Sequence, residues 1–273
     1  MRFLNYSEFF EANKKRWNER VNINAQSKFY DLESFLAGKT SLLPLEIIEL
    51  GDVTGKKLLH LQCHFGMDTL SWARNGAIVT GIDFAPEAIK LAQELSEQLK
   101  LNAKFIEANI YDIPNIINEK YDIVFTSYGV LCWLPDIKKW GEIINHCLKP
   151  GGVFYIIESH PFGFLIDENY MEKFQTIYPY FNEGKAIRFV DETNLIDKSK
   201  KLKHKISFEW IHPLSTIINS LIDIGLEIEF IHEFPYSFFP IHPDMIKGEN
   251  QYYHFQNKLF NVPMMFSLKA NKK

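Results

Sequence analysis

The stretch Lys57-Leu58-Leu59-His60-Leu61-Gln62-Cys63-His64-Phe65-Gly66-Met67-Asp68-Thr69-Leu70 decides the fold of this chain of 273 residues. A short apolar run is followed by a turn and then by apolar residues at helical spacing up to Asn75-Gly76. A second apolar run ends in the carboxylate of Asp83. This order predicts a buried strand, a tight turn, a helix and a second strand, the opening unit of a doubly wound nucleotide-binding sheet.

The turn and Asp83 together predict a site for an adenosine-containing ligand. Backbone N–H groups point outward at the start of a helix that follows a strand, and ligand atoms can approach them there. At the end of the second strand, Asp83 is placed to accept hydrogen bonds from both hydroxyls of a ribose. A dinucleotide site requires glycines where Gln62 and His64 stand, and only Gly66 is retained. The turn therefore favours a ligand without a pyrophosphate.

From Leu58 to Phe162 the chain resembles the class I S-adenosylmethionine-dependent methyltransferases. The wording Leu-Gln-Cys-His-Phe-Gly is similar to a bacterial branch of small, uncharacterised methyltransferases, and His60 stands where the family usually has an acid. The resemblance implies S-adenosyl-L-methionine as cofactor and methyl transfer to an N, O or S atom of a small molecule. It also implies an α/β fold with a doubly wound, seven-stranded, mostly parallel Rossmann-like sheet. The resemblance rests on the first turn, Asp83, Ala108-Asn109-Ile110-Tyr111-Asp112, Tyr121-Asp122-Ile123-Val124-Phe125-Thr126-Ser127 and Leu148-Lys149-Pro150-Gly151-Gly152.

The resemblance also gives a set of expected cofactor-binding residues. Asn109 matches a position where the family carries a polar group near the adenine, although asparagine favours turns in its own right. A packed, hydrogen-bonded core position is as acceptable for His60 as a ligand contact, whereas His64 lies in the turn and is expected to face the ligand. The expected set is Tyr30, Gln62, Cys63, His64, Gly66, Asp83, Phe84, Asn109, Ile110, Ser127 and Tyr128.

Two residues after the predicted fifth strand are expected to be catalytic. Methyl transfer is an in-line displacement from a sulfonium, and a base is needed only where the acceptor must lose a proton. Glu158 and His160 both follow the strand end, and a histidine titrates near neutrality. The alternative for Glu158 is that it only hydrogen-bonds the neighbouring loop. We expect no metal.

Four regions are expected along the chain. Phe3, Tyr6, Phe9, Phe10 and Trp17 recur at helical spacing and predict a helix. We expect Trp17 to pack on the sheet, and Phe29 and Tyr30 to cover the cofactor as part of a lid. The lysine run 198–205 predicts a solvated loop. The regions are an N-terminal helical lid (1–45), a cofactor-binding core (46–162), a substrate-side insertion (163–205) and a remainder with the last two strands, 226–234 and 263–270 (206–273).

Composition limits the classes of partner. A hydrophobic content of 46% and a charged content of 23% are typical of a soluble globule. A net charge of −4 gives no electrostatic footprint for nucleic acid or an anionic membrane. Three widely spaced cysteines and the lack of an apolar leader indicate a cytoplasmic protein with reduced thiols. We expect a small-molecule substrate and a monomer or homodimer.

Two other functions remain open at this point. A cofactor-binding or regulatory module could have kept the fold and lost turnover, because Gln62 and His64 depart from the family pattern. A nicotinamide oxidoreductase on the same sheet is less favoured, because the glycines are missing and no Tyr-x-x-x-Lys pair follows the fourth strand.

Overall fold

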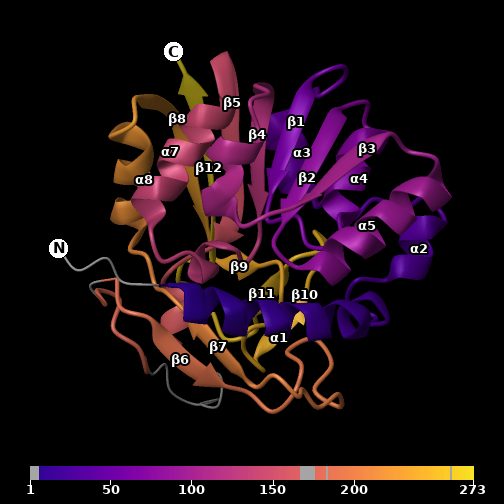
Figure 1. Cartoon of the computed structure of the whole chain (residues 1–273). Helices are drawn as coiled ribbons and strands as arrows, with labels where there is room; N and C mark the ends of the chain where they lie inside the picture. The colour runs from indigo at the N-terminus through magenta and orange to yellow at the C-terminus, as the bar shows by residue number, and fades with distance from the viewer. Residues whose placement is uncertain (1–5, 167–175, 183, 259) are drawn as a thin grey trace.

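A central seven-stranded sheet organises the computed structural model, which describes residues 6–166, 176–182, 184–258 and 260–273 (Figure 1). The strand order is β3-β2-β1-β4-β5-β12-β8. Strand β12 runs antiparallel to both of its neighbours, and the other adjacent pairs are parallel. The predicted doubly wound, mostly parallel sheet is therefore confirmed. The strands are β1 (Lys57–Leu61), β2 (Ile78–Asp83), β3 (Ala103–Glu107), β4 (Tyr121–Ser127), β5 (Leu148–Ser159), β8 (Leu226–Phe234) and β12 (Met265–Lys272).

Helices cover both faces of the sheet because the buried strands carry apolar side chains on both sides. Leu59 and Leu61 of β1 join one core with residues of α7 and α8. Leu58 of the same strand points to the opposite face and belongs to a second core with Trp72 of α4 and Leu50 of α3. The helices of these two layers are α3 (Pro44–Leu50), α4 (Met67–Arg74), α5 (Pro86–Leu99), α6 (Ile113–Ile116), α7 (Ile137–Cys147) and α8 (Leu214–Ile222).

The turn from β1 to α4 holds three residues in the left-handed backbone conformation. The φ angles are 56° at Gln62, 50° at His64 and 77° at Gly66. This conformation costs a residue with a Cβ roughly 1–2 kcal/mol. At Gly66 packing adds a second requirement, since a Cβ there would lie 2.7 Å from the Phe105 ring and 3.0 Å from the Ala92 Cβ. Gly66 thus lets α4 approach the sheet closely.

Three segments that are distant in sequence gather at the edge where the parallel strands end, the lower edge in Figure 1. The first is α1 (Ser7–Ala25), which is followed by α2 (Leu32–Leu36) at the right of the view beside α5. Phe3 and part of the predicted insertion lie outside the described residues. The other two segments are the ladder of β6 (Ile187–Val190) with β7 (Ile206–Glu209) and the small sheet of β9 (Tyr236–Ser237), β10 (Met245–Lys247) and β11 (Tyr253–Phe255).

The five short strands of these segments were missed by sequence reasoning. Each has only two to four residues, which is too short for a period-2 pattern to stand out among aromatics and turn formers. Because β7 pairs with β6, the insertion continues through Glu209. The boundary predicted at residue 205 therefore falls immediately before a strand that belongs to the insertion.

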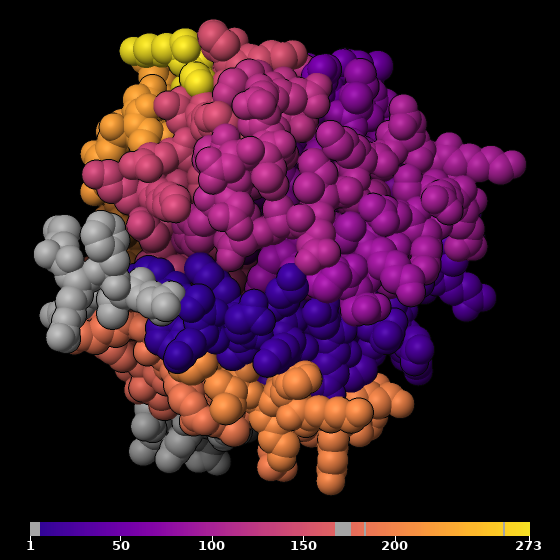
Figure 2. Space-filling view, in the orientation of Figure 1, coloured from indigo at the N-terminus to yellow at the C-terminus, as the bar shows by residue number. Residues whose placement is uncertain are grey.

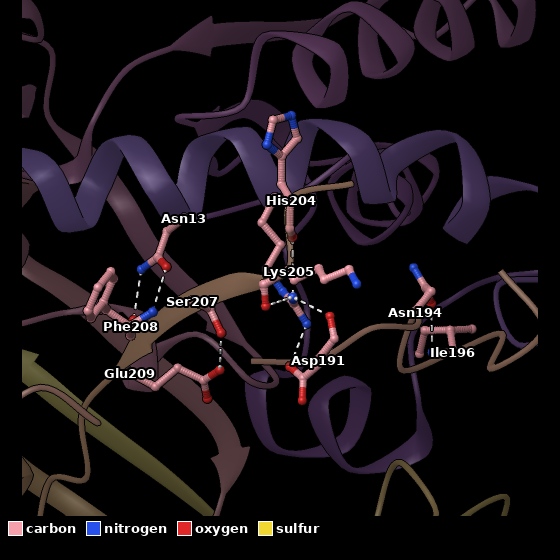
Figure 3. Close-up of polar contacts among 10 residues, drawn as sticks. Asn13, Asp191, Asn194, Ile196, His204, Lys205, Ser207, Phe208 and Glu209 are labelled. Atoms are coloured by element: carbon pink, nitrogen blue, oxygen red, sulfur yellow. Dashed lines mark hydrogen bonds and ion pairs between the residues drawn. The ribbon is translucent and has the colours of Figure 1, made fainter. Parts of the chain in front are cut away.

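Helix α1 is joined to the insertion by side-chain hydrogen bonds to backbone (Figure 3). Asn13 Nδ2 donates to Phe208 O at 2.8 Å, and Asn13 Oδ1 accepts from Phe208 N at 2.9 Å. Arg16 donates to Asp191 Oδ2 at 2.6 Å and to Lys205 O at 2.8 Å. The space-filling view shows α1 lying between the core and the insertion (Figure 2). The lysine run is exposed as expected, and its backbone also anchors the helix.

We predict that Gly66→Ala lowers the free energy of unfolding by about 2–4 kcal/mol, because it adds overpacking against Phe105 to the cost of a left-handed alanine. Gly55→Ala is the matched control: Gly55 has φ 71°, and a Cβ there meets no atom within 4 Å. The control should lose only about 1 kcal/mol. Equal losses in urea denaturation would contradict the close approach of α4.

Candidate active site

Asp83 ends β2 beside the left-handed turn and holds it. Its Oδ2 accepts from His64 N at 2.9 Å and its Oδ1 accepts from Ala85 N at 2.9 Å. Burial raises the pKa of Asp83 to about 6, although these N–H donors act in the opposite direction. Each carboxylate oxygen has a second lone pair. Asp83 can therefore accept hydrogen bonds from a ligand while it supports the turn.

A recess opens next to Asp83 at the strand ends. Asn109 and Ile110 come from the loop after β3, Trp133 comes from the loop after β4, and Phe10 comes from α1. Asn109 also accepts from Tyr111 N at 3.1 Å, so it shapes its own loop, as the turn propensity of asparagine suggested. Apolar walls with one carboxylate suit an adenosine. The lining residues are Phe10, Gln62, Ile82, Asp83, Phe84, Ala108, Asn109, Ile110, Trp133 and Leu134.

Two polar atoms of the turn are buried without a hydrogen-bond partner among the described residues. Gln62 donates through Nε2 to Val130 O at 3.1 Å, but its Oε1 has no donor. His64 Nε2 is likewise unpartnered. Buried polar groups are nearly always hydrogen-bonded in native proteins. The orphaned atoms of Gln62 and His64 therefore indicate a polar ligand at the turn.

Aromatic rings of the N-terminal segment close over the turn. The Tyr30 ring lies 5.5 Å from His64 and 4.8 Å from Phe65, centroid to centroid. Trp17 meets the rings of His64 and Trp133 edge-on, each at 5.3 Å. Trp17 packs against the apolar cluster that includes Phe105 of β3, as expected, but it also contacts the turn, because α1 crosses the strand ends. Tyr30 contacts the turn, and its role over the cofactor stays a prediction.

His60 is a core residue. Its Nδ1 lies 2.8 Å from Thr69 Oγ1 and its Nε2 lies 3.2 Å from Ser127 Oγ. Burial lowers the pKa of His60 to about 3, so the ring is neutral. Ser127 Oγ in turn donates to Asp68 Oδ2 at 3.2 Å. Asp68 thus brings a carboxylate to the end of β4, whereas position 60, where the family usually has an acid, is a histidine here. Sequence reasoning did not single out Asp68. Its position in the first turn of α4, directly after the predicted ligand-binding turn, could have indicated it.

Three residues of the expected cofactor set have structural roles: the side chains of Cys63 and Tyr128 point away from the recess, and Gly66 allows close packing. Cys63 is buried, and its Sγ would lie 2.8 Å from a Cβ on Gly81, so this thiol fills the core beneath the turn. The missing Cβ of Gly66 faces Phe105, so Gly66 serves packing. Tyr128 donates through its hydroxyl to Glu46 Oε2 at 2.7 Å and is absent from the described lining of the recess.

Glu158 anchors the loop that follows β4. Its carboxylate is buried and accepts four backbone hydrogen bonds, which occupy both oxygens. Of the two roles expected for Glu158, the geometry favours the structural one over that of a base. The donors are the N–H groups of Gly129 (2.5 Å), Val130 (2.7 Å), Leu131 (3.1 Å) and Ser159 (2.5 Å).

His160 also has structural partners. Its Nδ1 accepts from Phe162 N at 3.1 Å, and its Nε2 lies 2.9 Å from Glu233 Oε1 on β8. Burial lowers the pKa of His160, with Glu233 opposing the shift. The ring thus points toward the β12–β8 side of the sheet, and its side chain is not part of the described lining next to Asp83. The geometry argues against His160 as the base.

The described residues were also compared with what a membrane span or a metal site requires. No helix in the part of the chain that the structure describes is long and apolar enough to cross a membrane. Across residues 6–166, 176–182, 184–258 and 260–273, no three His, Cys, Asp or Glu side chains are grouped to hold a metal ion. Cys63, Cys132 and Cys147 are buried free cysteines.

Residues 59–154 match the family model described as a methyltransferase domain. A ubiquinone biosynthesis O-methyltransferase from Saccharophagus degradans is 30% identical over 144 residues, which cover 51% of this chain and 61% of that protein. An uncharacterised methyltransferase from Synechocystis is 28% identical over 141 residues, covering 51% and 58%. This chain thus spans less than two thirds of the length of either curated relative.

A solved structure of an S-adenosylmethionine-dependent methyltransferase from Mesorhizobium loti has the same fold. It superposes with a TM-score of 0.55 at 19% identity and covers 87% of this chain and 100% of that chain. The DhpI complex with SAH superposes with a TM-score of 0.56 at 14% identity, covering 96% of each chain.

We predict that Glu158→Gln lowers the free energy of unfolding by about 2 kcal/mol or more, because the glutamine NH₂ faces backbone donors and leaves some of them unpaired. Urea denaturation measures the loss. A variant with wild-type stability would contradict the anchoring role and would return Glu158 to the candidates for proton transfer.

Proposed function

We propose that this chain is an S-adenosylmethionine-dependent methyltransferase that acts on a small molecule. One observation carries the proposal: Asp83 and the left-handed turn meet beside an apolar recess, within the residues that match a methyltransferase domain. The bound cofactor would supply an electrophilic methyl group on a sulfonium. The protein would supply the binding and orientation of both reactants.

The residues at the strand ends fit the parts of this cofactor. Asp83 would accept the ribose hydroxyls, and the recess beside Asn109 and Ile110 would hold the adenine. The unpartnered Gln62 Oε1 and His64 Nε2 would meet polar atoms of the methionine arm. In a dinucleotide site, glycines at these two positions let the backbone approach the pyrophosphate closely. The side chains of Gln62 and His64 would crowd the pyrophosphate, so the turn disfavours a nicotinamide cofactor.

The acceptor would be a small molecule enclosed by the three segments at the strand ends. Trp17 and Tyr30 lie over the turn, and Phe29 packs edge-on against Phe239 with ring centroids 5.3 Å apart. The N-terminal segment thereby touches both the turn and the loop after β9. An enclosed aromatic site excludes water and suits a small acceptor better than a polymer.

Transfer would proceed by positioning rather than through either predicted base. Glu158 is saturated by backbone donors, and His160 faces Glu233. An acceptor that reacts without prior loss of a proton fits this arrangement best.

Thermal unfolding with S-adenosylmethionine, S-adenosylhomocysteine and NAD tests the proposed cofactor. Specific binding to the native state raises the unfolding midpoint, so the two adenosyl sulfur compounds should raise it and NAD should not. Stabilisation by NAD alone would contradict the proposal. Release of S-adenosylhomocysteine in the presence of candidate acceptors then separates an enzyme from a module that binds the cofactor without turnover.

We predict that Asp83→Ala weakens binding of S-adenosylhomocysteine by about 1–3 kcal/mol, because it removes a charged acceptor from the ribose. Asp122→Ala is the matched control, since Asp122 also accepts a backbone N–H, from Lys57 at 2.8 Å, but at the opposite end of β1. Calorimetry should show wild-type affinity for the control. Equal affinities of the two variants would contradict the assignment of Asp83.

The raised pKa of Asp83 also predicts a pH dependence. The ionised carboxylate is the better acceptor, so affinity for S-adenosylhomocysteine should fall as the pH drops below about 6, by up to about tenfold per unit. The ligand-free protein should behave in the opposite way: this pKa lies above the unfolded value of about 3.9, so the contribution of Asp83 to stability declines as the pH rises from about 4 to about 6. Asp83→Ala should remove both dependences in calorimetry and urea titration.

A further inference from the structure

Arg20 is a buried cation that forms no hydrogen bond or ion pair with the residues that the structure describes. Arg20 is one of the buried residues of α1, and only 5% of its surface is exposed. Its Nε is buried without a hydrogen-bond partner, and no ion pair of Arg20 is present among the described residues. The Cζ atom of its guanidinium lies 4.6 Å from the centroid of the Trp17 ring. An unpaired buried charge is costly unless something else neutralises it.

Arg16, one helical turn earlier, shows what a structural arginine looks like on the same helix. It is 3% exposed and donates to Asp191 Oδ2, Lys205 O and His204 O. The Nε of both arginines is unpartnered, but the two differ at the other guanidinium nitrogens. Those of Arg16 are bound to the insertion, whereas Arg20 has no hydrogen bond among the described residues. Packing of α1 explains Arg16 and leaves Arg20 unexplained.

Arg20 lies among the residues that close the site. Trp17, on which it stacks, contacts His64 of the turn and Trp133 of the recess. Burial lowers the pKa of His64 and the charge of Arg20 adds to that shift, while burial raises the pKa of Tyr30 and Arg20 opposes the rise. The cation therefore acts on the residues next to the proposed cofactor.

The carboxyl groups around Arg20 do not neutralise it. Asp191 is already bound by Arg16. Burial raises the pKa of Glu209 to about 7, so this group carries only part of a charge near neutral pH, and Ser207 Oγ donates to it at 3.1 Å. Asp68 and Asp83 lie close enough to Tyr30 to raise its pKa. The carboxyl groups that act on Arg20 are Asp191 and Glu209, and their repulsion disfavours a dianion such as a phosphate more than a singly charged ligand group.

We propose that Arg20 is the anchor for a carboxylate inside the closed site. The planar guanidinium can bind a carboxylate through two parallel hydrogen bonds. The proposal rests on the proposed function, which supplies two sources of that carboxylate: the methionine arm of the cofactor, or the acceptor molecule. Trp17 would hold the guanidinium in place by stacking.

Stability of the ligand-free chain is the first test. Arg16→Gln should lower the unfolding midpoint in urea, because it breaks the bonds to the insertion. Arg20→Gln should leave the midpoint unchanged or raise it, because it removes an unpaired buried charge. A drop in Arg20→Gln equal to that of Arg16→Gln would overturn the proposal, since Arg20 would then have a structural partner.

Calorimetry with three probes is the second test and distinguishes the two sources. The probes are S-adenosylhomocysteine, 5′-methylthioadenosine, which lacks the amino-acid carboxylate, and benzoate added to the complex with S-adenosylhomocysteine. If the cofactor is the source of the carboxylate, Arg20→Gln should weaken the binding of S-adenosylhomocysteine by about tenfold or more. If the acceptor is the source, the variant should weaken the binding of benzoate by a similar factor. Binding of 5′-methylthioadenosine should not change in either case.

Failure of the anchor and failure of the proposed function give different results. Wild-type affinity of Arg20→Gln for both carboxylate probes would overturn the anchor while leaving the cofactor assignment intact. A wild-type chain that binds neither adenosine compound would contradict the proposed function. Benzoate titrated alone into wild type and Arg20→Gln then tests the anchor separately, and equal results for the two proteins would overturn it.

Discussion

The site depends on one constraint: the chain must leave β1 and enter α4 through a left-handed turn. Asp83 on the neighbouring strand holds this turn through His64 N, and Gly66 lets the helix close on the sheet. The same carboxylate retains free lone pairs toward the recess. The residue that holds the turn is therefore also the one that we propose to bind the ligand, and the turn is shaped before a ligand arrives.

The second requirement is closure, and it depends on polar bonds between α1 and the insertion. Asn13 pairs with both backbone groups of Phe208, and Arg16 joins Asp191. These contacts lie outside the recess, but they fix the register of α1. That register brings Trp17 against His64 of the turn, with Arg20 stacked on Trp17, a place that a helix packed on a sheet face would not reach.

The sequence predicted the sheet because long apolar strands and the helix between each pair have strong periodic patterns. It also placed Asp83 at the end of the second strand, since the end of a strand in a parallel sheet has a defined position, while the binding role of Asp83 stays a prediction. It did not reveal the directions of Cys63 and Tyr128, because a residue next to a site can point into the core. Arg20 and Asp68 were missed because their places depend on contacts between segments far apart in the chain. The five short strands at the strand-end edge were missed because two to four residues are too few for a period-2 pattern to stand out.

A crystal structure of the complex with S-adenosylhomocysteine tests the central claim most directly, namely that the left-handed turn and Asp83 bind an adenosine under α1. The account predicts the ribose hydroxyls on the Asp83 carboxylate and the adenine in the recess beside Ile110. It also predicts that the backbone from Gln62 to Gly66 keeps its left-handed conformation. A ligand bound away from Asp83, or a turn that rearranges to admit it, would contradict the account.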